Sequence, residues 1–486
     1  MAQEITANNP GQLVRDRLPI RTKVCYGLGT ALDMWGLWLY PGVAFAVFNI
    51  YLGVSPWLVG LALTIIRLYD AFSDPFVGWI SDNVRTKYGR RRPFILISGI
   101  LCGLGLPIMF LVSPAWSDKT FLGVSAVFWY MIFSNMIYIP IFSTFTVPFN
   151  SLANELTPDY EERTSIMTYR SAMQKVFEVA NFYGLRFTNL AWFLVPGTGK
   201  QNVLLGLRVY TCILGVVMAI FAIIIFLNVK ERYYEKLVVK KKQERVSLKS
   251  SFYETLTCRP FLFMLLVGAS FNLGTSMLGT LGYYATVYYV CAGDTVSGNA
   301  WNFWMGMAFM FGGLIGAPVL NRVAHFAGKR NALIVTAFIG IIAYAGSWYL
   351  YTPAIQWLQT VASCLMGLTA SGLWMLYGSI CADVIDYDEL HTGKRREGSF
   401  TSCGTYILKL GNSLGGLLAG SVLSWIGYNA VLAVQTPETV FWIRVTLASI
   451  PLVGMTLVII FILQVPLTKK ICEEIRATLE SRRGQV

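Results

Sequence analysis

The sequence predicts an all-α membrane protein with twelve transmembrane helices arranged as two six-helix halves. The prediction rests on the composition, on a series of long apolar segments and on an internal repeat. Of the 486 residues, 55% are hydrophobic and only 13% are charged, whereas soluble proteins are about 25% charged. So much apolar surface cannot be buried in a soluble globule, which excludes a soluble enzyme, a secreted disulfide scaffold and a nucleic-acid-binding domain.

Twelve segments are apolar over the length of about 20 residues that a bilayer-crossing helix needs. They span residues 24–52, 56–82, 93–113, 120–150, 164–194, 203–228, 259–291, 299–324, 330–352, 355–385, 399–427 and 438–466. The fifth is the most polar, because it holds Arg170, Lys175, Glu178 and Arg186. We expect this helix to face other helices or an aqueous cavity rather than lipid.

The distribution of basic residues predicts the orientation of the chain. The net charge is +13, which alone could indicate a nucleic-acid partner. Most of the 39 Lys and Arg residues, however, fall in tails and loops on one side of the predicted membrane, and the opposite loops hold only Lys119 and Lys200. Basic loops stay in the cytoplasm. We therefore expect no nucleic-acid partner, and a multi-pass plasma-membrane protein, of a bacterial inner membrane, with both termini cytoplasmic.

An internal repeat divides the chain into halves. The sequence GWISDNVRTKYGRRRP (78–93) follows the second span, and GAPVLNRVAHFAGKRN (316–331) follows the eighth. Both begin with Gly and end on a basic stretch with Gly-Lys/Arg-Arg. The predicted parts are a cytoplasmic tail (1–23), a six-helix bundle (24–228), a basic cytoplasmic central loop (229–258), a second bundle (259–467) and a cytoplasmic tail (468–486).

Two six-helix halves with equivalent loops resemble the major facilitator superfamily. The first copy of the repeat carries the loop signature of that superfamily through Gly78, Asp82, Gly89, Arg90 and Arg91. In such folds the substrate binds near the membrane midplane, between the halves.

Three charged residues lie inside the second span, at Arg67, Asp70 and Asp74. Their i, i+3, i+7 spacing places them on one face of a helix. Each would cost about 2.5–3.5 kcal/mol facing lipid, so we expect them to face the protein interior. Two carboxylates with one Arg leave a surplus negative charge, which suits Na⁺ or H⁺. Hydroxyl ligands could come from Ser73, Ser143 and Thr144; the alternative is a structural Arg–Asp pair.

Two further charges lie in apolar surroundings, Asp33 in the first span and Lys409 in the eleventh. A lone Lys inside the membrane needs an anionic partner. We expect Lys409 to pair with an Asp of the second span or with Asp33, and a change of partner would couple cation and substrate binding. The alternative for Lys409 is that its long side chain reaches the membrane interface.

Five segments together resemble the glycoside–pentoside–hexuronide:cation symporters, the melibiose-permease-like branch of the major facilitators. They are YGLGTALD (26–33), RLYDAFSDPFVGWISD (67–82), VPFNSLANELTPDYEERT (147–164), CADVIDYDE (381–389) and TYILKLGNSLGG (405–416). The resemblance extends over nearly the whole chain.

The resemblance implies a role for individual residues. Asp70 and Asp74 match the cation-site carboxylates, and Ser73 and Ser143 stand where the sodium-using sugar permease has Asn and Thr. Lys409 matches a Lys tied to coupling and sugar binding. Arg170, with a register shift of one residue, and Trp374 match residues of the sugar pocket. Asp383, Asp386 and Arg395 match a cytoplasmic charge network, to which we add three residues as a gating group: Arg67, Asp82 and Arg90.

The chain also departs from the melibiose-type pattern. It has Asp33-Met34 where those proteins have Lys-Asp, Thr146 in place of a sugar-binding Asp, and Asn150 in place of an aromatic residue. The predicted substrate site is therefore a polar pocket of Asp33, Thr146, Asn150, Arg170, Trp374 and Lys409. An acidic or sulfated sugar and a neutral glycoside both fit this set.

We therefore expect a secondary active transporter that carries a sugar or glycoside with Na⁺ or H⁺. It would act as a monomer without a cofactor, and Na⁺ would bind at Asp70 and Asp74. The alternatives are a lysolipid carrier of the same fold and a non-transporting membrane sensor. A membrane-embedded enzyme is not indicated, because an HExxH motif is absent and His325 and His391 fall in predicted cytoplasmic loops.

Overall fold

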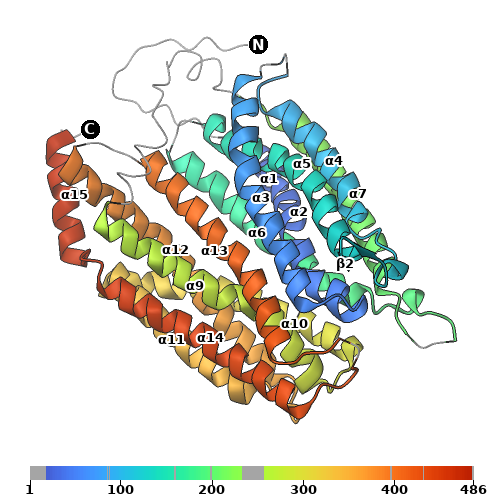
Figure 1. Cartoon of the computed structure of the whole chain (residues 1–486). Coiled ribbons are helices and arrows are strands. Elements are labelled where there is room, and N and C mark those ends of the chain that lie inside the picture. Colours follow the sequence, from blue (N-terminus) through green and yellow to red (C-terminus); the bar gives the residue numbers. More distant parts are fainter. Residues whose placement is uncertain are drawn as a thin grey trace.

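The computed structural model describes residues 18–84, 86, 88–157, 160–197, 200–231, 257–393, 397–430 and 432–483. Most of the predicted central loop 229–258 and the first predicted tail lie outside these ranges, as does Arg395. Figure 1 shows the first half of the chain, in blue to green, as one helical bundle beside a second bundle in yellow to red.

Helices of the first bundle follow the predicted spans in order. The first span is built from two consecutive helices and a π-helical end. The elements are α1 (Ile20–Gly27), α2 (Gly29–Ala44), η1 (Phe45–Tyr51), α3 (Pro56–Asn83), α4 (Arg92–Ile108), α5 (Ala126–Leu156), α6 (Tyr160–Phe187) and α7 (Val203–Asn228), with short 3₁₀ turns at Pro114–Trp116 (η2) and Ala191–Phe193 (η3).

The second bundle repeats this plan, and its first span also ends in a π-helical turn. Its elements are α9 (Arg259–Tyr284), η5 (Ala285–Val290), α10 (Thr295–Ala327), α11 (Lys329–Leu350), α12 (Leu358–Thr392), α13 (Glu397–Trp425), α14 (Pro437–Leu463) and α15 (Lys469–Arg483). The equivalent loops of the repeat share a backbone feature, since Gly89 and Gly328 both have positive φ, at 111° and 83°.

The structure places a helix at every predicted span. Within the described residues, nine helical segments are long and apolar enough to cross a membrane, so the chain is a multi-pass membrane protein. The other three spans coincide with α4, which is short, and with α3 and α6, which carry several charges. A count of twelve membrane crossings stays a prediction.

Several predicted boundaries are wrong. The fourth span does not begin at 120, because Thr120–Phe121 (β1) and Val124–Ser125 (β2) form an antiparallel hairpin. Positive φ angles at Leu122 and Gly123 give its tight turn. The fifth span ends at Phe187 rather than 194. His325 and His391 lie in the last turns of α10 and α12 rather than in loops.

Glycines bring helices of each bundle into backbone contact. A Cβ added at Gly103 of α4 would collide with the carbonyl of Gly215 on α7, and one at Gly312 of α10 would collide with the carbonyl of Cys364 on α12. Such close approach is the usual way in which helices associate in membranes, where the hydrophobic effect does not drive association.

The two bundles meet tightly at the end of the molecule remote from α15, which we call the far end (Figure 1). There a Cβ at Gly60 of α3 would collide with the carbonyl of Gly416 on α13, and Thr64 Oγ1 donates to the Ser413 carbonyl at 2.7 Å. Asn189, after α6, donates to the Val296 carbonyl of α10 at 2.9 Å. Helix pairs α3–α13 and α6–α10 therefore hold the far end closed.

Candidate cation and substrate site

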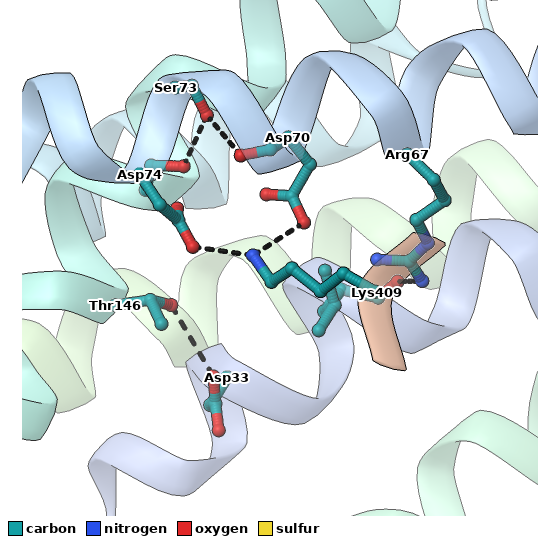
Figure 2. Close-up of polar contacts among 9 residues, drawn as sticks. Asp33, Arg67, Asp70, Ser73, Asp74, Thr146 and Lys409 are labelled. Carbon is teal, nitrogen blue, oxygen red and sulfur yellow. Dashed lines mark hydrogen bonds and ion pairs between the residues drawn. The ribbon is translucent and has the colours of Figure 1, made fainter. Parts of the chain in front are cut away.

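The predicted cation residues meet where α3 faces α13. The ammonium of Lys409 lies 2.5 Å from Asp74 Oδ2 and 3.1 Å from Asp70 Oδ2. Figure 2 shows it reaching between the two carboxylates, which α3 places one turn apart. The Asp70 side chain is 5% exposed and that of Lys409 is 30% exposed. Lys409 thus has the anionic partners that its position requires.

Hydroxyl groups border this ion-pair triad. Ser73 Oγ lies 2.9 Å from Ser143 Oγ and donates to the Asp70 carbonyl at 3.1 Å. The structure therefore brings Ser73 and Ser143 together, and Figure 2 shows Ser73 beside Asp70. Thr144 instead donates to the Pro140 carbonyl of its own helix at 2.7 Å, so its hydroxyl is turned away from the triad.

A second polar cluster joins α2, α5 and α6 within the first bundle. Asp33 accepts a hydrogen bond from Thr146 at 3.4 Å and lies 3.6 Å from the Arg170 guanidinium. Arg170 also donates to Asn150 Oδ1 at 2.7 Å and lies over the Phe149 ring at 5.4 Å. Four of the six predicted substrate residues are thus in direct contact with one another.

Trp374 belongs to the other bundle. Its ring packs edge-on against Phe271 at 5.5 Å and Tyr377 at 5.6 Å, and it is 38% exposed. It borders a cavity of about 340 Å³ between α9, α10, α11 and α12, to which Phe182 of α6 also contributes, and aromatic residues and Met form most of the lining. The described contacts of Trp374 are therefore to an aromatic wall and not to the Asp33 cluster.

Asparagine amides on α9 and α13 were not identified from the sequence. Asn272 on α9 is 5% exposed, and its amide nitrogen has no partner among the described residues. Asn412 on α13 lines a cavity between the bundles. The signal that could have found them is an amide side chain within an apolar span, since a buried polar group needs a partner.

The predicted gating residues separate into different places. Arg67 does not form the alternative Arg–Asp pair: it donates to the Leu37 carbonyl at 3.2 Å and lies over the Trp38 ring at 5.2 Å. Asp383 pairs with Lys329 at 2.6 Å, a partner that the sequence did not indicate. Asp82 is the last but one residue of α3, but its side chain lies outside the description, and Asp386 lies on α12.

The loop of the first repeat is held by Glu231, which follows α7. Its carboxylate accepts hydrogen bonds from the backbone N–H groups of Arg90, Arg91 and Arg92 at 2.8, 2.7 and 3.0 Å. These groups open α4 and have no partner within the helix. Because the carboxylate sits against Gly89, a Cβ there would lie 2.7 Å from Glu231 Oε1. Arg90 therefore contributes its backbone to this contact.

Two helical bundles with a polar triad between them, and a second polar cluster inside the first bundle, define a membrane transporter of the major facilitator fold. The chain belongs to the family described as MFS/sugar transport protein, whose model matches residues 25–469. It is a secondary active transporter and not an enzyme, as the sequence predicts.

Relatives and solved structures agree with this assignment. The chain is 26% identical over 478 residues to the glucuronide carrier protein homolog of Escherichia coli (strain K12), covering 97% of each chain. It is 25% identical over 444 residues to the isoprimeverose transporter of Lactiplantibacillus pentosus, covering 89% of this chain and 85% of the other. A bacterial homolog to the human lysosomal transporter Spinster superposes with a TM-score of 0.59 at 16% identity, covering 97% and 100%, which shows the fold.

Proposed function

We propose that this protein carries a sugar or glycoside, neutral, acidic or sulfated, together with Na⁺ or H⁺, and that the cation binds at Asp70 and Asp74. The observation that carries the proposal is the single ammonium of Lys409 shared between two carboxylates. Relatives named as a glucuronide carrier and an isoprimeverose transporter support the substrate class.

The triad has one negative charge in excess, because two carboxylates face one ammonium. A monovalent cation entering beside Ser73 and Ser143 cancels that excess, and it weakens the hold of the carboxylates on Lys409. The released ammonium can then donate to a hydroxyl or acid group of the substrate. Since coupling is reciprocal, substrate raises the affinity for the cation by the same factor.

The Asp33 cluster would form the substrate-binding wall of the first bundle, and Trp374 that of the second. Asp33 and Arg170 offer an acceptor and a fork of donors to sugar hydroxyls, while the Trp374 ring offers an apolar surface. The side chains of Asp33 and Arg170 are 18% and 20% exposed, which leaves them open to a ligand. We assign no cofactor beyond the coupling cation.

The contacts at the far end support an inward-facing state. With both termini in the cytoplasm of a bacterial cell, the closed α3–α13 and α6–α10 contacts lie on the outer side of the inner membrane. Transport would open these contacts as the bundles rock about the central site. The two bundles of one chain supply the whole site, so we propose that the protein acts as a monomer.

Substrate counterflow in proteoliposomes tests the proposal. A panel of neutral, acidic and sulfated glycosides is measured with and without Na⁺ and with an imposed pH gradient. We expect one class to exchange, and Asp70→Asn or Asp74→Asn to abolish its cation-driven accumulation. Asp118→Asn, an exposed loop carboxylate, is the matched control and keeps accumulation unchanged.

Three results would overturn the proposal. Accumulation that survives Asp70→Asn and Asp74→Asn rules out the cation site. Exchange of lysophospholipid in place of every glycoside favours the lysolipid carrier, and exchange of no compound at all favours the sensor.

A further inference from the structure

A separate cavity of about 170 Å³ lies between the bundles, beside the triad and toward the closed far end. Its walls come from α2, α3 and α5 of the first bundle and from α9 and α13 of the second. Arg67, one turn before Asp70 on α3, lines it together with Trp38, Asn135, Thr280 and Asn412. Typical pockets for whole ligands measure about 300–1,000 Å³, so this space suits one functional group.

Arg67 brings a positive charge into this cavity without an acidic partner. A guanidinium has five N–H donors, and among the described residues the hydrogen bond of Arg67 goes to the Leu37 carbonyl at 3.2 Å. No carboxylate within the described ranges lies at ion-pair distance from it. Figure 2 shows the Arg67 side chain apart from the Lys409 ammonium and its two carboxylates.

The other buried cations near the centre are neutralised. Lys409 has Asp70 and Asp74, Arg170 has Asp33, and Lys175 has Glu178 at 2.7 Å. Arg67, in contrast, has no ion pair within the described part of this central region, because the carboxylate of Asp70, whose charge acts on it, is bound to Lys409.

Further donors converge on the same space from the second bundle. The Asn412 amide and the Thr280 hydroxyl line the cavity, and neither has a hydrogen bond within the described part of the chain. A guanidinium, an amide and a hydroxyl are the donor set that a carboxylate or sulfonate accepts, with the guanidinium fork matching two of its oxygens.

We propose that the Arg67 cavity is an anion subsite that binds one carboxylate or sulfonate group. The inference rests on the proposed symport function, since it assigns the place where the acid group of a substrate, or a small free anion that accompanies transport, is held. Because Arg67 and Asn412 belong to different bundles, an anion between them also favours the closed far end.

Binding to the purified full-length protein in nanodiscs, with Na⁺ present, tests this subsite. The probes are methyl β-D-glucuronide, methyl β-D-glucoside, and sodium acetate, methanesulfonate and chloride alone, followed by calorimetry. The variants are Arg67→Gln, Arg67→Lys and Asn412→Ala. Arg444→Gln is the matched control, because Arg444 also donates to a backbone carbonyl (Trp348, 2.9 Å) and lies over aromatic rings, but outside the cavity.

If the substrate supplies the acid group, the wild type binds the glucuronide about tenfold more tightly than the glucoside. Arg67→Gln removes this preference, Arg67→Lys and Asn412→Ala keep part of it, and Arg444→Gln leaves it unchanged. If a free anion is the ligand, acetate, methanesulfonate or chloride binds the wild type directly and loses about tenfold in Arg67→Gln, while both glycosides bind alike.

The proposal is overturned if Arg67→Gln changes neither the glycoside preference nor the binding of any small anion relative to Arg444→Gln. Binding of small anions is read without transport and without a glycoside. A failure of the symport proposal therefore leaves this result readable.

Discussion

The triad of Asp70, Asp74 and Lys409 and the cluster around Asp33 are both buried polar groups, but they sit differently in the molecule. The triad joins α3 to α13 across the two bundles, at 2.5 and 3.1 Å. The Asp33–Arg170 pair stays within one bundle at 3.6 Å. When the two bundles rock as rigid bodies, distances change only between residues of different bundles. The ion pairs of the triad therefore depend on the conformation of the transporter. The Asp33 cluster travels as a fixed surface.

The largest effect should follow from removing the charge of Lys409, which links α13 of the second bundle to α3 of the first. Lys409→Gln leaves two carboxylates facing each other, which destabilises the protein by about 2 kcal/mol, less than the 3–5 kcal/mol of fully buried pairs because the site is partly exposed. Na⁺ should restore that stability, giving a melting temperature that rises far more steeply with Na⁺ than in the wild type. The measurement compares the melting temperatures of Lys409→Gln and the wild type in Na⁺ and in choline. If the melting temperature of Lys409→Gln does not depend on Na⁺, the triad does not bind the cation.

A smaller effect should come from the packing beside the triad. Gly60→Ala places a Cβ against the Gly416 carbonyl, so the far end should open more often. The readout is the alkylation of Ser276→Cys, at a position that lines the Arg67 cavity, by a membrane-impermeant maleimide applied to cells. The rate of alkylation should rise about tenfold when Gly60→Ala is added, which corresponds to a shift of about 1.4 kcal/mol in the equilibrium between the closed and open far end. Gly279→Ala, which meets no atom within 4 Å, is the control. Equal rates in the two variants would mean that this contact does not gate the far end.

The smallest effect is expected in the cluster that stays within one bundle. Arg170→Lys removes the guanidinium that donates to Asn150 and that offers further donors to the substrate, so the KM for substrate should rise up to about tenfold. The cation concentration for half-maximal uptake should stay nearly the same. Initial uptake rates measure both constants, with Arg186→Lys on the same helix as the control. A shift in cation dependence as large as that in KM would erase the distinction between the two regions.

The sequence predicted those parts of the fold and site that depend on burial alone. Apolar length located a helix at every span, and a lone Lys409 among apolar residues required the Asp pair that the structure provides. Directions of side chains were not predictable. Spacing put Arg67 on the same face as Asp70, but its long side chain reaches the Leu37 carbonyl and the Trp38 ring instead.

Ion pairs between residues of distant segments could not be predicted from the sequence either. Lys329 binds Asp383 because α11 begins beside α12, and nothing in either segment specifies the other. The hairpin before α5 was missed because its apolar residues continue the hydropathy of the span, whereas two positive φ angles at Leu122 and Gly123 turn the chain.

The contact made by Glu231 has a mechanical consequence. Residue 231 is where the described chain leaves the first bundle, and its carboxylate is fastened to the start of α4 at 2.7–3.0 Å. Residue 231 is thus tied to α4 as well as to α7, and these two helices already touch through Gly103 and Gly215. A force that reaches residue 231 along the chain is therefore shared by α4 and α7.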